Sequence, residues 1–259
     1  MNMLVFHMEI LDGSDGYFRH QIIHQDQHTE IFYNPVKREA VFPNSDPASL
    51  ILKENQDQIL KILRTKRIDT FYPGFKLKFI IMDKKEVAQF NDLSHVIILD
   101  RRNGEDELKI TNHGKPEIHE IFTDACFLEQ KNRSGIAMVI KSPDGKYQLE
   151  HIASLANNNC LAELEAAMKG FEMLGSYKKI RLVTDSRYVR KGITEWMLYW
   201  RLNNWMTANG EPAKNIEYWK KMDQLTEGKY IEVAWVKGHS GHFENTMCDL
   251  YARDAAEKN

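Results

Sequence analysis

The chain has 259 residues, of which 42 % are apolar and 28 % charged, with 35 Lys and Arg against 37 Asp and Glu. This composition excludes a wholly disordered chain and a collagen-like fibre. We also read neither a membrane span nor a secretory signal in it, because no 18 apolar residues run together. Three cysteines without a C-x-x-C spacing are typical of reduced thiols, so we expect a cytoplasmic protein. The near-neutral charge weighs mildly against binding nucleic acid by bulk electrostatics.

The first half of the chain predicts a small α+β domain. Apolar runs at 3–11, 18–24 and 30–34 are separated by turn residues and are typical of β-hairpins. Apolar positions from Pro47 to Leu63 recur on one face of a helix, and strand-like runs follow at 77–82 and 95–99. The polar, Gly- and Pro-containing stretch 101–116 is a candidate linker. We therefore expect two domains, residues 1–117 and residues 118–259.

The role of residues 1–117 is less apparent. Residues 1–120 have no tryptophan and a net charge of −3, so we expect residues 1–117 to bind a protein partner or to self-associate rather than to grip phosphates. The local basic cluster Lys61–Arg67 leaves a contact with nucleic acid open. A second open alternative is that this segment is a degenerate duplicate of the second half of the chain. It has the order β-β-β-α-β, with Asp12, Glu54 and Asp83 in analogous elements.

The second half predicts an α/β fold with a five-stranded mixed sheet flanked by helices. Strands are expected at 121–127, 135–140, 147–153, 179–184 and 230–236. Helices are expected at 160–174, from residue 188 onward through a Trp-rich region, and at 244–257. The order β-β-β-α-β-α-β-α places helices on the faces of the sheet.

Four acidic residues of the second half lie in four different predicted elements. Asp124 lies in the middle of the first strand, where an unpaired carboxylate is costly. Asp185 directly follows the fourth strand, at the end where sheets with parallel strands bind ligands. Glu163 lies in a helix whose positions i+3, i+4 and i+7 are Ala or Gly, which lets that helix approach the sheet. Asp249 lies in the last helix.

Each of these acids alone has a simpler interpretation. Glu163 and Asp249 fit solvated helix faces, and Asp185 fits a helix N-cap. Together, four carboxylates suit hard divalent cations such as Mg²⁺. Two such ions about 4 Å apart would clamp the attacking and leaving oxygens of a phosphodiester. Spacing alone does not establish that the four side chains converge.

Residues 119–256 resemble type 1 ribonuclease H, with its motifs in the family's order and at its intervals. The matching segments are Phe122-Thr-Asp-Ala-Cys, Ala162-Glu-Leu-Glu-Ala-Ala, Val183-Thr-Asp-Ser-Arg-Tyr-Val, Gly192-Ile-Thr-Glu-Trp-Met and the stretch from Trp235 to Asp249. The resemblance implies a ribonuclease H-like fold preceded by an accessory domain. It also implies hydrolysis of the RNA strand of RNA–DNA hybrids, with two Mg²⁺ or Mn²⁺ ions, leaving 5′-phosphate and 3′-hydroxyl ends. Asp124, Glu163, Asp185 and Asp249 match the family's metal-binding acids.

The resemblance also implies further site residues. His239, between two glycines in the sequence Gly238-His-Ser-Gly, matches a loop histidine that assists proton transfer or product departure. His242 we interpret as structural. Candidate substrate-binding residues are Asn159, Arg187, Trp196 and Lys214. Trp196 and Trp200 share a helical face, which is more often a core pattern.

The sequence departs from the family pattern at the substrate grip. The family's DNA-gripping handle is often rich in Lys and Arg, yet residues 201–214 hold only Arg201 and Lys214. Ala125 replaces a usual glycine, the turn at 129–134 differs, and Cys160 stands where a second Asn falls in the family. We therefore predict weak hybrid affinity for residues 118–259 alone. Two alternatives stay open: a nuclease of the same fold acting on DNA, and a non-catalytic hybrid-binding protein.

Overall fold

The computed structural model describes residues 4–81, 93, 95–207, 209–238 and 242–258. The chain divides into two compact units, which are described separately. One unit contains residues 2–87 together with 199–214, and the other contains residues 88–198 and 215–259 together with residue 1. Among the described residues, none of the helices is both long and apolar enough to cross a membrane.

The unit containing the N-terminal residues is built on a five-stranded antiparallel sheet in the order β4-β3-β2-β1-β5. Its strands are β1 (Leu4–Ser14), β2 (Tyr17–His24), β3 (Gln27–Asn34), β4 (Glu39–Val41) and β5 (Lys76–Ile81). The helix predicted over 47–63 is two helices, α1 (Pro47–Glu54) and α2 (Gln56–Arg64), because the Asn55 side chain donates to Ile51 O at 3.0 Å and ends the first. The short η1 (Ile68–Thr70) follows.

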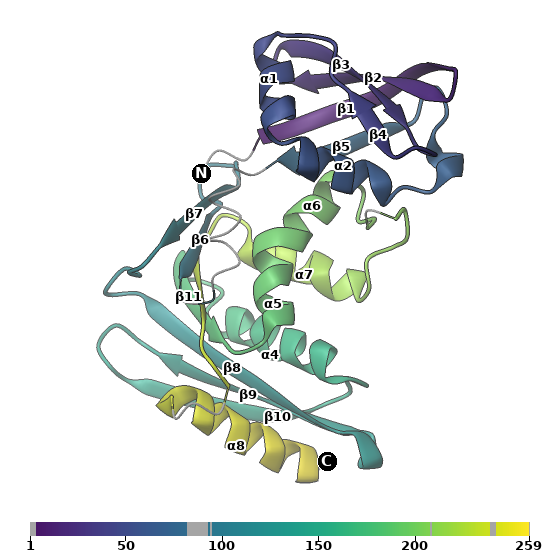
Figure 1. The fold of residues 1–259 in the computed structure, drawn as a ribbon. Helices are drawn as coiled ribbons and strands as arrows, with labels where there is room; N and C mark the ends of the chain where they lie inside the picture. Colours follow the sequence, from purple (N-terminus) through teal and green to yellow (C-terminus); the bar gives the residue numbers. More distant parts are fainter. Residues whose placement is uncertain (1–3, 82–92, 94, 208, 239–241, 259) are drawn as a thin grey trace. The chain divides into compact units, whose positions relative to one another are not determined.

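The second unit contains a seven-stranded mixed sheet in the order β10-β9-β8-β11-β12-β6-β7 (Figure 1). The five strands predicted for it are β8 (His119–Leu128), β9 (Arg133–Lys141), β10 (Tyr147–Ser154), β11 (Lys179–Thr184) and β12 (Tyr230–Trp235). Strand β11 runs parallel to β8 and β12, and the other pairs are antiparallel. The predicted mixed α/β sheet is thus confirmed, with two additional strands. In the N-terminal sheet the strand after the helices, β5, is antiparallel to β1, which does not match a duplicate of this sheet.

The two additional strands, β6 (Val96–Asp100) and β7 (Glu107–Thr111), come from the segment expected to precede the domain boundary. Leu99 pairs with Ile231 of β12, so β6 continues the sheet. The buried Arg101 forms ion pairs with Asp106 at 2.9 Å and Asp223 at 2.8 Å. Residues 95–117 therefore pack with the C-terminal sheet, and the compact units divide after residue 87, whereas the sequence predicts a domain boundary at residue 117. The stretch 101–116, predicted to be a linker, contains β7. The sequence did not indicate this strand because the long-range contacts that hold it are not visible locally.

Helices cover both faces of the mixed sheet (Figure 1). Ala125, Ile136 and Met138 pack against α4 (Asn159–Met173), whereas their strand neighbours, including Phe122, pack against α8 (Phe243–Lys258). Alternate residues of a strand point to opposite faces, which explains this division. The remaining helical elements are η2 (Glu129–Lys131), α5 (Arg187–Lys191), the π-helical turn η3 (Gly192–Trp196), α6 (Met197–Leu202) and α7 (Ile216–Thr226).

Candidate active site

Helix α4 lies close to strand β8 because its facing residues are small, as the sequence predicts. Ala162, Ala166 and Ala167 are fully buried. A Cβ built on Gly170 would lie 2.4 Å from Cγ2 of Ile121, so no larger residue fits there. The helix begins at an N-cap, Asn158, whose side chain accepts from Leu161 N at 3.0 Å. This close packing fixes the start of α4, where Glu163 lies.

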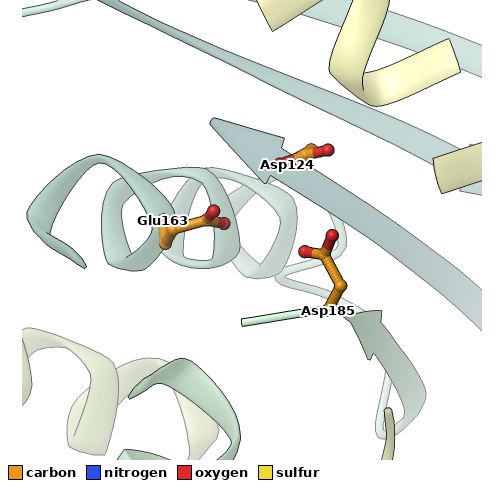
Figure 2. Close-up of side chains that lie close together, drawn as sticks. All are labelled: Asp124, Glu163 and Asp185. Carbon is orange, nitrogen blue, oxygen red and sulfur yellow. The ribbon is translucent and has the colours of Figure 1, made fainter. Parts of the chain in front are cut away.

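Three of the four predicted acids converge at one edge of the sheet. Asp124 comes from β8, Glu163 from α4, and Asp185 from the residue after β11, and their carboxylates point toward one another (Figure 2). One carboxylate oxygen from each lies within 4.8 Å of the others. Three acids from distant parts of the sequence thus form one group that could hold a metal ion.

Burial and mutual repulsion both disfavour the charged forms of these acids. Asp124 is 7 % exposed and Glu163 is 6 % exposed. Burial, together with the charges of Asp185 and Asp249, raises the pKa of Asp124 to about 7. Burial and the charges of Asp124 and Asp185 raise the pKa of Glu163 well above its usual range. A bound cation would reverse this effect, because it stabilises the ionised carboxylates.

Few protein donors serve these carboxylates. Asp124 Oδ1 accepts from Ala125 N at 2.8 Å, and Glu163 Oε1 accepts a long bond of 3.4 Å from the Asn159 amide. Glu163 Oε2 is buried and has no hydrogen-bond partner among the described residues. A buried carboxylate oxygen without a donor is costly unless a cation neutralises it. The all-oxygen donor set and this oxygen fit a hard divalent cation.

The structure does not place all the predicted catalytic residues in this group of three. Asp249 lies in α8, outside the 4.8 Å group, yet near enough for its charge to raise the pKa of Asp124. His239 lies outside the described residues. The preceding Gly238 is described, and a Cβ built there would lie 2.5 Å from Oδ2 of Asp185. The residue before the predicted histidine therefore lies directly beside Asp185.

The candidate substrate-binding residues occupy different environments. Asn159 is an exposed residue at the start of α4, and Arg187 is an exposed residue at the start of α5. Trp196 is half-buried at the end of η3, with its ring 5.9 Å from that of Tyr188. Lys214 is exposed and belongs to the other compact unit. Of these four, only Asn159 contacts a member of the acid group among the described residues.

Asn245 and Gly238 are site residues that the sequence reasoning did not select. The Asn245 amide donates to Asp185 Oδ2 at 3.4 Å, and its Oδ1 atom is buried with no hydrogen-bond partner in the described part of the chain. Asp185 is also held by its carbonyl, which accepts from Trp235 Nε1 at 2.9 Å. Asn245 lies four residues before Asp249, one helical turn away, and this spacing is the signal that could have identified it. His242, interpreted as structural, packs its ring on Phe122 at 5.6 Å.

Comparison with known proteins identifies the family. The RNase H family model, described as "RNase H", matches residues 116–257. A ribonuclease H from Aeromonas salmonicida is 42 % identical over 137 residues, which are 53 % of this chain and 88 % of that protein. A ribonuclease HI from Vibrio cholerae is 41 % identical over 138 residues, again 53 % of this chain and 88 % of that protein. The structure of a foamy viral protease-reverse transcriptase in complex with RNA/DNA hybrid matches with a TM-score of 0.50 and 12 % identity. The match covers all of this chain and 39 % of the viral chain, and it shows a likeness in fold alone. Since the family model spans more than half of the chain, the protein belongs to the RNase H family, whose members hydrolyse the RNA strand of RNA–DNA hybrids.

Proposed function

We propose that this protein is an endonuclease that hydrolyses the RNA strand of RNA–DNA hybrids by two-metal-ion catalysis, leaving 5′-phosphate and 3′-hydroxyl ends. The single observation that carries the proposal is the group of buried Asp124, buried Glu163 and half-buried Asp185, in which Glu163 Oε2 has no hydrogen-bond donor among the described residues. Asp124 and Glu163 are both buried, and two buried carboxylates beside a third acid have no economical structural role. Their position in an RNase H family domain supports phosphodiester hydrolysis.

The RNase H family depends on divalent metal, and we propose Mg²⁺, with Mn²⁺ as a substitute. Asp124, Glu163, Asp185 and Asp249 would hold two ions. When bound, these ions supply an activated water and charge stabilisation for the leaving oxygen. The chain itself contributes the orientation of the carboxylates. The Ala125 N–H orients Asp124, while the amides of Asn159 and Asn245 orient Glu163 and Asp185.

The remaining site residues are proposed to act on protons and on the substrate. His239 would move a proton to or from the reacting phosphate, a task that suits a side chain titrating near neutrality. Its position one residue after Gly238, which lies against Asp185, supports this role. Asn159, Arg187, Trp196 and Lys214 would contact the sugars and phosphates of the hybrid.

We assign catalysis to residues 118–259 and an accessory role to residues 1–117. Binding of a protein partner or self-association through the N-terminal segment remains a prediction. A reducing, cytoplasmic compartment also remains our proposal, supported by the free thiols of Cys126, Cys160 and Cys248.

The proposal is tested by measuring cleavage of three nucleic-acid substrates under three metal conditions. Full-length protein is incubated with labelled RNA–DNA hybrid, duplex DNA and duplex RNA, each with Mg²⁺, Mn²⁺ or EDTA. We expect metal-dependent cutting of RNA in the hybrid alone. Cutting of duplex DNA would instead support a nuclease that acts on DNA, and binding without cutting would support a hybrid-binding protein.

A further inference from the structure

A group of basic side chains lies on the N-terminal sheet unit, where α2 meets the β3–β4 turn. We call Arg38, Lys61 and Arg64 the basic patch. Arg64 donates from Nε and Nη2 to the carbonyl oxygen of Arg38, at 3.3 Å and 3.1 Å, so the end of α2 touches the turn. Lys61 precedes Arg64 by three residues on α2, which places both on one helical face. All three residues are exposed.

The charges of the basic patch are not neutralised by carboxylates. Other cations of the same unit pair with acids: Arg19 with Asp12, and Lys76 with Glu9 at 3.3 Å. Within the described ranges of the chain, Arg38, Lys61 and Arg64 form no ion pair. This contrast matters because surface cations with carboxylate partners offer less net charge to a ligand.

The two guanidinium groups also act together on a buried group. Burial raises the pKa of Tyr33, and the positive charges of Arg64 and Arg38 both oppose that rise. Both positive charges therefore act on the same residue of the sheet, Tyr33. The neighbouring Lys37 is exposed at the tip of the turn but pairs with Glu39 at 3.9 Å, so it is not counted in the basic patch.

The compact unit that carries the basic patch also contains the handle segment, residues 199–214. Within that unit, Lys78 N donates to the Asn203 side chain at 3.3 Å. The handle segment corresponds to the part of the resembling family that grips the DNA strand, yet it holds only Arg201 and Lys214 as basic residues. The unit thus has more cationic residues on its N-terminal part than on the segment where the family usually has them.

We propose that Arg38, Lys61 and Arg64 form a contact surface for the phosphate backbone of the RNA–DNA hybrid, an inference that rests on the proposed substrate. Guanidinium and ammonium groups bind phosphate oxygens by charge-assisted hydrogen bonds. Such contacts carry no sequence information and make binding dependent on salt. The basic patch would supply part of the electrostatic grip that the handle segment lacks.

The test compares two matched double variants of the full-length protein. Lys61→Gln with Arg64→Gln removes two unpaired cations, while the control, Arg19→Gln with Lys76→Gln, removes one Arg and one Lys that have carboxylate partners. Hybrid binding is measured in EDTA over a range of salt concentrations, so that cleavage plays no part. Circular dichroism melting checks that both variants remain folded.

We expect the patch variant to bind hybrid more weakly at low salt. Its slope of log K against log salt should be shallower by about 1–2, since each lost phosphate contact removes about 0.9. The control should match the unsubstituted protein, and the kcat of the patch variant with Mg²⁺ at saturating hybrid should not change. An unchanged slope and affinity in the patch variant overturns the inference. So does loss of a protein dimer in sedimentation with hybrid binding intact, which would assign the surface to a protein contact.

Failure of the inference and failure of the proposed function give different results. A protein that cuts hybrid normally but shows no change of slope in the patch variant refutes the phosphate surface alone. A protein that binds hybrid with the expected change of slope, yet never cuts it with any metal, refutes the proposed function and supports the phosphate surface.

Discussion

Replacing Asp124 by Asn should stabilise the metal-free protein while abolishing hydrolysis. In the folded chain the pKa of Asp124 is about 7, against 3.8 for the free side chain. Because the pKa is higher in the folded chain than in the unfolded chain, ionisation of Asp124 destabilises the folded state. This penalty is absent below about pH 3.8, grows as the pH rises, and is complete above about pH 7. At pH 8 the penalty is on the order of 4 kcal/mol, because each pKa unit corresponds to about 1.36 kcal/mol. Asparagine cannot ionise and carries no such penalty.

Unfolding by urea in EDTA, followed by tryptophan fluorescence, measures this effect. Trp196, Trp219 and Trp235 lie in the compact unit that contains Asp124, whereas Trp200 and Trp205 lie in the other unit, so the signal reports on both units. At pH 5 Asp124 is protonated in the folded chain but ionised in the unfolded chain, so part of the penalty of about 4 kcal/mol is already present. The free energy of unfolding of the variant should therefore exceed that of the unsubstituted protein by about 2–3 kcal/mol more at pH 8 than at pH 5.

Asp254→Asn is the matched control for loss of one negative charge. Asp254 is a half-buried residue of α8, where it pairs with Lys258 at 2.7 Å. The free energy of unfolding of this control should not rise relative to that of the unsubstituted protein between pH 5 and pH 8. Equal behaviour of the two variants, or a loss of stability in Asp124→Asn at pH 8, would refute the conclusion that the buried acids repel one another without a cation.

Three further predictions follow from close contacts and strand pairing. Gly238→Ala places a methyl group against Asp185 Oδ2, within 2.5 Å, and should raise the Mg²⁺ concentration for half-maximal activity about tenfold; an unchanged Mg²⁺ titration would show that the loop does not support the acid. Gly192→Ala brings a Cβ within 1.8 Å of the buried Trp219 ring and should cost about 1–3 kcal/mol of unfolding free energy, measured by urea titration; a stability equal to that of the unsubstituted protein contradicts this packing. A fragment of residues 88–259 should be soluble and folded. Residues 118–259 lack β6 and β7 and expose the edge of β12, so this shorter fragment should aggregate in a sedimentation experiment. Equal solubility of the two fragments would remove the reason for the domain limit at residue 87.

The element order of the C-terminal half could be predicted because its signals are local. Residues 121–127 of β8 form an apolar run interrupted by one acid, and the small residues of α4 predict a helix that lies against a sheet. Asp124 stands out for the same reason, since a carboxylate in the middle of an apolar strand needs a partner, whereas Glu163 and Asp185 are informative only together with it. Their convergence required the fold, because they come from three elements that are distant in sequence.

The pairing of β6 with β12 could not be predicted from the sequence. The stretch around β7 is polar and turn-rich, and its place in the sheet depends on contacts such as that of Arg101 with Asp223, across more than 100 residues. The division of the predicted first helix at Asn55 depends on one side-chain hydrogen bond to Ile51. Local propensity is too weak to decide either feature against tertiary contacts.

The central claim is that the buried acids carry out metal-dependent hydrolysis of RNA in a hybrid. The most direct measurement is the rate at which full-length protein cuts the RNA strand of a labelled hybrid with Mg²⁺, for the unsubstituted chain and for Asp124→Asn. We predict cutting by the unsubstituted chain that stops with EDTA, and no detectable cutting by the folded variant. Turnover by Asp124→Asn at the rate of the unsubstituted chain would contradict the account.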